Sequence, residues 1–418
     1  MKVHSLWLTG VALAALIVPV SAASAAASGS STAVMLDQAN QRIGELDQRV
    51  DALEAELQAS EQRQAADRSA MAAPPTVTGG WWDNTTISGR MYWDFSYVEN
   101  KTNTGGGGAF VKSGTLNGTS FDIKRFYLGV DHKFNDVYSA NLTTDFTYDS
   151  TTGVNQIYIK KAYLQAKVND ALVFKVGSTD MPWIPFMEDI YGFRYVENTL
   201  TDRLKDGNSA DWGAHVSGKL YDGMLNYAVS VVNGAGYKKA NIFRTNGPDV
   251  EARVNLNLGD FIFGVGGYDG KFGKQFGSAL HHSFSRGDAV AAYVAKDFRV
   301  GVEGFVGENV SSVSSVTGDR ESGVGGFASW TFMPEWTVFG RYDWSTKRVA
   351  AGPAMPNNYY NAGIEWNPIK IVDFSLVYKH EDENGNYATS NLAAGAAPPT
   401  PGAKTRYDEI GIFGQVRW

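Results

Sequence analysis

The stretch that decides the fold is Ile87-Ser88-Gly89-Arg90-Met91-Tyr92-Trp93-Asp94-Phe95-Ser96-Tyr97. Its odd-numbered residues are apolar or glycine apart from Tyr97, and its even-numbered residues are mostly polar. Successive side chains of a β-strand point to opposite faces, so one face can contact lipid and the other water. A soluble sandwich alternates in the same way, so alternation alone does not decide. Strand length does, because many such runs span about 9–13 residues, as a tilted membrane crossing requires.

The connections between these runs alternate between short and long. The short ones are turns of two or three residues: Asn135-Asp136, Asn169-Asp170, Asp222-Gly223, Gly259-Asp260, Pro334-Glu335 and Asn367-Pro368. The long ones are polar, glycine-rich segments such as 101–119, 179–208, 233–248 and 381–405. A barrel that crosses a membrane keeps short turns at one end and long loops at the other. The pattern therefore predicts an all-β chain that forms a transmembrane antiparallel barrel in a bacterial outer membrane.

We count about sixteen crossings, and an even number places both chain ends on the periplasmic side. Barrels of 16 to 18 strands enclose an aqueous channel, whereas eight-stranded barrels are filled by side chains. The weakest alternation lies near 171–178 and 270–287, so eighteen strands stay an alternative. The predicted crossings are 86–98, 120–134, 137–148, 156–168, 171–178, 209–220, 224–232, 249–258, 261–269, 288–296, 298–306, 322–332, 336–344, 359–366, 370–380 and 406–418.

Composition supports a barrel and excludes several other classes. Aromatic residues make up 13% of the chain and glycine is frequent at 46 residues, which suits strands with interfacial aromatic girdles. No apolar run long enough for a membrane helix follows the N-terminus. Cysteine is absent, which excludes disulfides and thiolate metal sites. The net charge of −7 does not favour nucleic acid as a partner.

The N-terminal region has two parts before the barrel domain, which we assign to 76–418. Residues 1–27 have a short basic start, an apolar core and small residues at a cleavage site, as a secretory signal peptide does. Residues 28–75 form a periplasmic segment with a heptad pattern and a proline-rich linker. We expect this helix to self-associate in a homotrimer, and the alternatives are packing on the barrel or contact with peptidoglycan. The heptad residues are Leu36, Ala39, Ile43, Leu46, Val50, Leu53 and Leu57.

The polar faces of the strands carry charges of both signs, as expected for the wall of a water-filled channel. A segment of about 30 residues, Ser178 to Ser209, is the third long connection and contains Trp183, Ile184 and Phe186. Such apolar residues favour folding into the barrel, where the charges of the segment would narrow the pore; a surface lid or a trimer contact is the alternative. The predicted pore-lining and constriction residues are Arg90, Asp94, Arg125, Lys133, Lys161, Arg253, Arg341, Asp180, Glu188, Asp189 and Arg203.

The final segment alternates as well: Ile410, Ile412, Gly414, Val416 and Trp418 share one face. A terminal aromatic residue on an alternating strand resembles the signal by which outer-membrane barrels are recognised for assembly. We therefore assign Trp418 as an assembly signal.

Three stretches resemble the phosphate-selective porin O/P family. They are Phe121-Asp122-Ile123-Lys124-Arg125-Phe126-Tyr127-Leu128-Gly129-Val130, then Lys161-Ala162-Tyr163-Leu164-Gln165 with Phe174-Lys175-Val176-Gly177-Ser178, and Asp211-Trp212-Gly213 through Gly218. The resemblance spans most of 86–418 and implies a trimeric, sixteen-stranded diffusion pore. Anion selectivity in that family rests on arginine and lysine clusters, whereas the wall predicted here balances cations with carboxylates. The sequence therefore predicts a general or weakly selective channel.

Catalytic and cofactor motifs are absent from the sequence, so we expect no enzyme activity and no cofactor or metal. His281-His282 lacks a carboxylate at ligand spacing, and Gly105-Gly106-Gly107-Gly108 lacks the lysine and helix of a phosphate loop. The main hypothesis is passive diffusion of small hydrophilic solutes through a pore held in outer-membrane lipid. The alternatives are a channel selective for phosphate, other anions or sugars, and a cell-wall tether anchored by the barrel.

Overall fold

The computed structural model describes residues 80–103, 108–112, 117–149, 154–239, 247–272, 283–309, 319–348, 352–384 and 403–418, with 37, 40–46, 48–53, 55 and 58 near the N-terminus. The predicted signal peptide lies outside the described residues, as do heptad residues Leu36, Ala39 and Leu57. The chain divides into two compact units, Met1–Pro74 and Pro75–Trp418.

The second unit begins with a short 3-10 helix, η1 (Trp81–Asn84), and continues as one antiparallel sheet. Its first strands are β1 (Thr85–Asn103), β2 (Val111–Lys112), β3 (Gly118–Lys133), β4 (Tyr138–Asp149), β5 (Val154–Asn169), β6 (Leu172–Asp180), β7 (Ala210–Leu220) and β8 (Leu225–Val232). After a second 3-10 helix, η2 (Tyr237–Lys239), follow β9 (Asp249–Leu258), β10 (Phe261–Gly270), β11 (Phe284–Val294), β12 (Phe298–Glu308), β13 (Arg320–Met333), β14 (Trp336–Arg348), β15 (Met355–Ile369), β16 (Val372–Asn384) and β17 (Lys404–Arg417).

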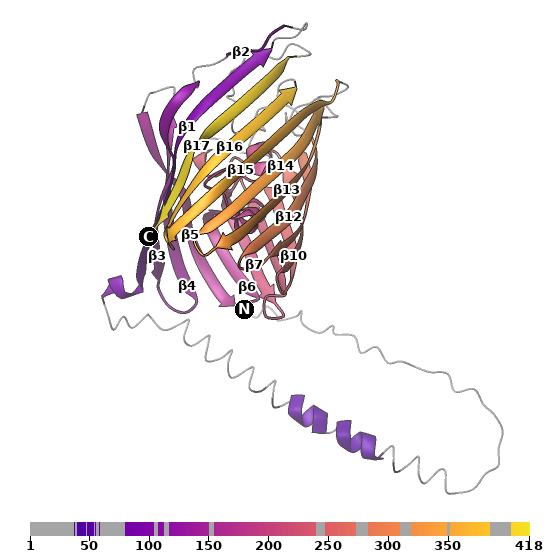
Figure 1. The fold of residues 1–418 in the computed structure, drawn as a ribbon. Coiled ribbons are helices and arrows are strands. Elements are labelled where there is room, and N and C mark those ends of the chain that lie inside the picture. Colours follow the sequence, from indigo (N-terminus) through magenta and orange to yellow (C-terminus); the bar gives the residue numbers. More distant parts are fainter. Residues whose placement is uncertain are drawn as a thin grey trace, which may run out of the picture. The chain divides into compact units, whose positions relative to one another are not determined.

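The sheet closes on itself, because β1 pairs with β3 on one side and with β17 on the other. Of its seventeen described strands, β2 has two residues and pairs only with the end of β1. The other sixteen are long and form the tilted barrel of Figure 1. The prediction of an antiparallel barrel of about sixteen strands is confirmed.

The connections alternate in length as the sequence predicts. Two to four residues join β3 to β4, β5 to β6, β7 to β8, β9 to β10, β11 to β12, β13 to β14 and β15 to β16. The connections at the other end include 181–209, 233–248 and 385–403. One predicted turn was wrong: Asn367-Pro368 lies within β15, where the register shifts between Trp366 and Ile369, and the turn follows at 370–371. The proline is accommodated by this irregularity in the pairing.

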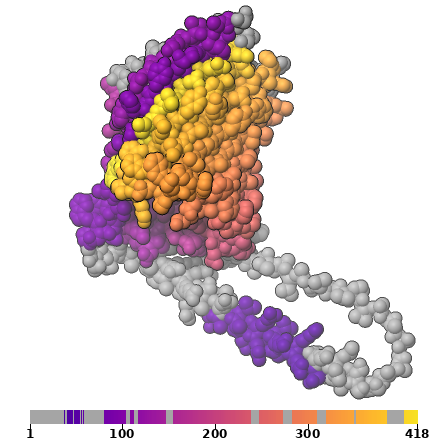
Figure 2. Space-filling view, in the orientation of Figure 1, coloured from indigo at the N-terminus to yellow at the C-terminus, as the bar shows by residue number. Residues whose placement is uncertain are grey.

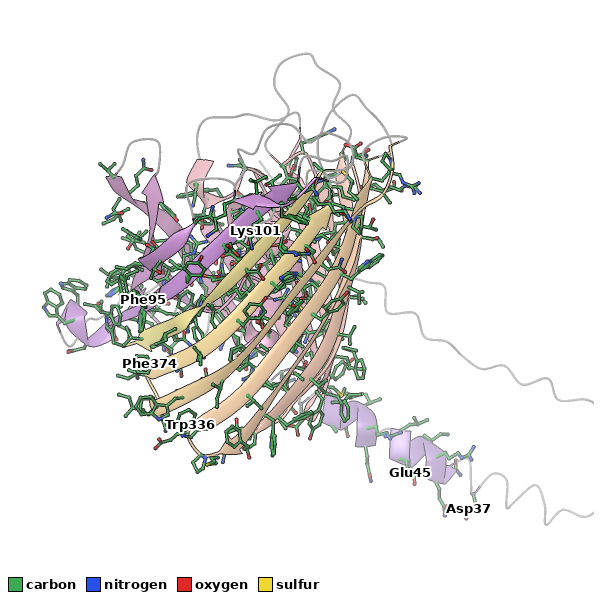
Figure 3. All side chains as sticks on the ribbon, turned by 45° about the horizontal axis from the view of Figure 1, so that its top comes forward. Asp37, Glu45, Phe95, Lys101, Trp336 and Phe374 are labelled. Atoms are coloured by element: carbon green, nitrogen blue, oxygen red, sulfur yellow. The ribbon has the colours of Figure 1, made fainter. Side chains whose placement is uncertain are left out.

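The outer face of the barrel is apolar and is bordered by aromatic rings. Figure 3 shows Phe95, Phe374 and Trp336 pointing away from the wall, whereas Lys101 lies nearer the end with the long connections. Between these aromatic residues, the outer face carries exposed aliphatic side chains such as Val302, Val338 and Leu376. In the space-filling view of Figure 2, the strands on this side form a continuous surface. A large exposed apolar surface of this kind is what a lipid environment requires.

The first unit contains helical residues at 40–46 and 48–53. The apolar residues of its heptad pattern that the structure describes are all exposed: Ile43, Leu46, Val50 and Leu53. Among the described residues, no helix is both long and apolar enough to cross a membrane.

Candidate functional site

The connection between β6 and β7 folds into the barrel rather than away from it. It contains two short helices, α2 (Ile184–Tyr191) and α3 (Leu200–Arg203), and α2 ends at Gly192, whose left-handed φ of 82° suits a residue without a Cβ. We call residues 181–209 the inner loop. Its aromatic side chains form the main hydrophobic core together with inward residues of β11 to β17, among them Phe327, Phe339 and Phe413. Phe193 stacks on Phe339 with ring centroids 4.1 Å apart.

Glycines on the inner face of β10 make room for the start of the inner loop. A Cβ at Gly266 would lie 2.6 Å from the indole of Trp183, and one at Gly264 would lie 3.0 Å from the ring of Phe186. The guanidinium of Arg253 on β9 lies over the ring of Phe186, 4.0 Å from its centroid, and donates to the carbonyl of Pro182 at 2.8 Å. The glycines of β10 therefore leave space for Trp183 and Phe186, two of the apolar residues from which the sequence predicts an inward fold of this segment.

Buried ion pairs hold the second half of the inner loop against the wall. Arg203 contacts Asp343 on β14 at 3.1 Å and Glu381 on β16 at 2.6 Å, and all three side chains are fully buried. Arg341 donates to the carbonyl of Asn198 at 2.7 Å and pairs with Asp343 at 2.8 Å. Breaking a buried pair of this kind leaves an uncompensated charge and is strongly destabilising. These contacts therefore anchor the second half of the inner loop to the wall.

Glu197 of the inner loop also stays charged inside the barrel. Burial alone would raise the pKa of this carboxyl, but Lys379 and Lys124 lower it, and the net result is a pKa of about 2. Its carboxylate lies 3.6 Å from the Lys379 ammonium and accepts a hydrogen bond from Tyr359 at 3.2 Å.

The opposite side of the lumen contains two cavities. A cavity of about 540 Å³ lies between α2 and the wall formed by β1 and β3 to β6. The loop side of this cavity carries Glu188 and Asp189, and the wall side carries Arg90, Lys160 and Lys161. A second cavity of about 830 Å³ lies toward the short turns and includes Asp189, Lys219 and Arg253 in its lining. Asp189 of the inner loop thus lines both cavities. We call the two cavities together the passage.

Two β-bulges increase the positive charge of the open wall. In the pairing of β1 with β3, Tyr92 lies opposite Arg125 and Trp93 opposite Ile123, so Lys124 is the extra residue. In the pairing of β4 with β5, Lys160 is the extra residue between Ile159 and Lys161. A bulge interrupts the alternation of faces, so two consecutive side chains point inward. The wall therefore presents two cation pairs, Lys124 with Arg125 and Lys160 with Lys161.

Most of these cations have carboxylate partners. Lys124 contacts Asp94 at 3.0 Å, Arg125 contacts Asp145 at 3.2 Å, and Lys161 contacts Asp180 at 2.5 Å. Lys160 and Arg90 instead contact tyrosine hydroxyls. The Lys160 ammonium donates to Tyr127 at 3.3 Å, and Arg90 donates to Tyr92 at 3.2 Å.

On the loop side, Arg194 pairs with Glu188 at 2.6 Å, which leaves Asp189 as the exposed carboxylate. The passage thus has unmatched positive charge on the wall and unmatched negative charge on the loop. Such facing charges act on ions that pass between them.

The predicted site residues fall into three groups. Seven of them contribute to the open passage or its ion pairs: Arg90, Asp94, Arg125, Lys161, Asp180, Glu188 and Asp189. Arg203 and Arg341 do not line water, because both are buried between loop and wall. Lys133 is exposed at the end of β3 near the short turns, and Arg253 supports Phe186.

Strict alternation does not predict Lys124 and Lys160 as lumenal residues, because it assigns both to the lipid face. The sequence nevertheless indicates their position through the doublets Lys124-Arg125 and Lys160-Lys161. In a membrane strand without a bulge, one member of each doublet would face lipid at a cost of about 2–4 kcal/mol. Consecutive cations in such a strand therefore indicate a bulge.

Trp418 lies at the seam that closes the barrel. Its backbone N–H donates to the carbonyl of Gly89 at 3.1 Å, and the N–H of Gly89 donates to the Trp418 carbonyl at 3.0 Å. The indole covers Gly89, where a Cβ would overlap it, and lies 5.7 Å from the ring of Phe126.

Comparison with known proteins identifies shared architecture only. No family model matches the chain, and no curated protein matches it in sequence. Among solved structures, the anion-selective porin from Comamonas acidovorans matches with a TM-score of 0.55 and 12% identity over 80% of this chain and 99% of that one. The outer membrane channel DcaP of Acinetobacter baumannii matches with a TM-score of 0.55 and 12% identity over 80% and 97%. The trimer form of OmpT from Vibrio cholerae matches with a TM-score of 0.52 and 13% identity over 80% and 99%. The chain therefore has the fold of outer-membrane porins.

Proposed function

We propose that the protein is an outer-membrane porin, a water-filled channel for passive diffusion of small hydrophilic solutes and ions, without enzyme activity. The observation that carries this proposal is the cavity of about 540 Å³ between a fixed inner loop and a charged wall. An apolar outer face suits lipid, and an inner passage bounded by charges of both signs suits water and ions. The short turns then lie in the periplasm together with both ends of the chain.

The balance of charge at the passage favours a weakly selective channel. Three of the five inward cations described above are paired with carboxylates, and a guanidinium or ammonium already paired binds a passing anion less strongly. A second candidate is an anion-selective channel of the phosphate-selective porin O/P type. The two bulges favour it, because they place Lys124 and Lys160 on the inner wall.

We also propose that the protein assembles as a homotrimer with the heptad helix as a tether between subunits. Isolated helices of this length are marginally stable in water, and the four exposed apolar residues need a partner. Three barrels in one membrane would hold three helices at high local concentration. Contact of the same helix with peptidoglycan is the alternative assignment.

Single-channel recording in planar bilayers tests the proposed channel. We expect stepwise conductance that requires no ligand, and a small reversal potential in asymmetric KCl. The absence of conductance steps from correctly folded protein would contradict the porin assignment. A strong cation preference would exclude the phosphate-selective variant, whereas a strong anion preference would favour it over the weakly selective channel.

A further inference from the structure

The outer face of β11 to β14 contains a groove near the end with the long connections. Its volume is about 640 Å³, and half of its lining residues are small: Ser285, Gly287, Gly307, Ser322, Thr346 and Ala354, with Val306 as an apolar wall. Arg286 and Glu321 belong to the lining as well, but their side chains are buried. Arg320, Arg348 and Glu308 also line it. The lumenal passage is lined by none of these residues, so the groove is a separate feature.

Two arginines face each other directly across this groove. Arg320 on β13 and Arg348 on β14 are paired residues in the strand register. Like charges placed directly opposite each other destabilise a sheet. Arg320 contacts Glu308 at 3.2 Å, but these side chains are 72% and 63% exposed, so the pair contributes little. Among the described residues, none forms an ion pair with Arg348. An anion between the two guanidinium groups would remove their repulsion.

The height of the arginines matches the headgroup layer. The outward residues of β14 are Trp336, Val338, Gly340, Tyr342, Trp344, Thr346 and Arg348. With a rise of about 3.3 Å per residue and a tilt of about 40°, Trp336 and Trp344 are separated by roughly 20 Å along the membrane normal. The two tryptophans thus border a band close to the usual apolar height of about 25 Å, and Arg348 lies roughly 10 Å beyond the second one.

We infer that this groove binds the phosphorylated headgroup of an outer-leaflet lipid, with the phosphate between Arg320 and Arg348. Guanidinium groups donate paired hydrogen bonds to phosphate oxygens, which suits two arginines that converge on one groove. Val306 and the glycines leave space for the first part of an acyl chain beside the apolar band. The inference rests on the proposed outer-membrane location, and it concerns the lipid-facing side rather than the channel.

Binding of bisphosphorylated lipid A to the full-length protein in maltoside micelles tests the inference by native mass spectrometry. We expect the wild type to retain one lipid A per chain and to lose this preference for lipid A from which the phosphates have been removed. The double variant R320Q/R348Q should bind at least tenfold more weakly. The matched control is R406Q, because Arg406 lies on the outer face of β17 near the same end but is paired with Asp382 at 3.0 Å.

A second variant, S322E, places a carboxylate in the groove without removing an arginine, and it should weaken binding to a similar extent. Equal binding of lipid A by the wild type and both variants would overturn the inference. So would equal retention of the dephosphorylated lipid, or inorganic phosphate that binds as tightly as lipid A. Conductance of the same preparations separates the two proposals: normal channels without lipid binding would refute the groove alone, and lipid binding without conductance would refute the porin function.

Discussion

Lys160 owes its position on the inner wall to one extra residue in β5. The bulge turns its side chain inward, where it contacts Tyr127 instead of a carboxylate. Arg90 likewise contacts a tyrosine hydroxyl, and among the described residues neither cation forms an ion pair with a carboxylate. At the residue scale, we therefore expect ion selectivity to depend on which charges lack an ion-pair partner rather than on how many charges are present.

Neutralising both cations should shift the ion preference of the channel. For the double variant R90Q/K160Q we expect a reversal potential displaced toward cations in asymmetric KCl, because the wall then lacks its unmatched positive charge. The shift should decrease at high salt, since screening shortens the range of the field. The control is K370Q, an exposed lysine in the turn at 370–371. An unchanged reversal potential in R90Q/K160Q would contradict this assignment.

Removing the negative charge of Asp189 should shift the reversal potential in the direction opposite to that expected for R90Q/K160Q. In D189N the loop loses its exposed carboxylate, which lines both cavities of the passage. We expect a displacement toward anions, measured under the same ionic conditions. D202N serves as the comparison, because Asp202 is already paired with Arg194 at 3.2 Å. A larger effect in D202N than in D189N would show that the passage lies elsewhere.

The alternation of residues in β1 predicts its lumenal face, but it does not distinguish charges that meet water from charges that are buried. Arg90 and Asp94 follow from alternation alone, as the structure places them. The same alternation predicts Arg341 on the channel wall, and the charges of the third long connection place Arg203 at the constriction, yet both side chains are buried. The carboxylate partners of Arg203 are 140 and 178 residues distant in the chain, so no local pattern could reveal their pairing. Whether a lumenal charge meets water depends on where the inner loop packs.

At the scale of elements, the inner loop and β10 fit each other through shape. The glycines of β10 form a shallow track on the inner face, and Trp183 and Phe186 occupy it. The length and apolar residues of the loop predicted that it enters the barrel, and the structure has it there. The glycines that receive it were not predicted, because a glycine in a strand also occurs at bends and bulges.

Filling the track should displace the inner loop. In G266V the new side chain would occupy the position of the Trp183 indole, which lies 2.6 Å from a Cβ at this residue. We expect larger conductance with more current noise, and a red-shifted tryptophan emission from the exposed indole. The control is G326V on the outer face of β13, where a Cβ has only an ordinary contact at 3.9 Å. Identical records for both variants would refute the role of this packing.

The buried arginine should matter more for loop position than for barrel closure. In R203M the carboxylates of Asp343 and Glu381 lose a partner inside the barrel, at a cost of about 3–5 kcal/mol. We expect a folded barrel with unstable current levels and faster proteolysis between residues 181 and 209. The control is K205Q, since Lys205 is exposed in the same loop. A steady wild-type conductance in R203M would contradict the anchoring role.

For the whole molecule, the barrel and the heptad helix have separate predicted roles. The alternating pattern and connection lengths were sufficient to predict the closed sheet, because both follow from the geometry of strands in a membrane. Subunit number does not follow from one chain. The exposed Ile43 and Val50 indicate only that the helix needs an apolar partner.

Deleting residues 28–75 should weaken the trimer without changing the channel. We expect dissociation at lower protein concentration in mild detergent, measured by native mass spectrometry, with unchanged conductance per open pore. The paired substitution I43D/V50D should reproduce the effect, whereas E45Q should not, because Glu45 is a polar position of the heptad. Trimers that persist equally in all three proteins would assign the helix to another contact.

The anchoring of the inner loop also dictates an order of folding. Tyr195 contacts Ser375 across 180 residues of sequence, and Arg203 contacts Glu381 across 178. Contacts between such distant residues form late, because the intervening chain must be ordered first. The loop can dock only after β14 and β16 have joined the sheet. Until then the charges of the loop are still hydrated, so the passage acquires its final width only after the chain has been ordered as far as β16.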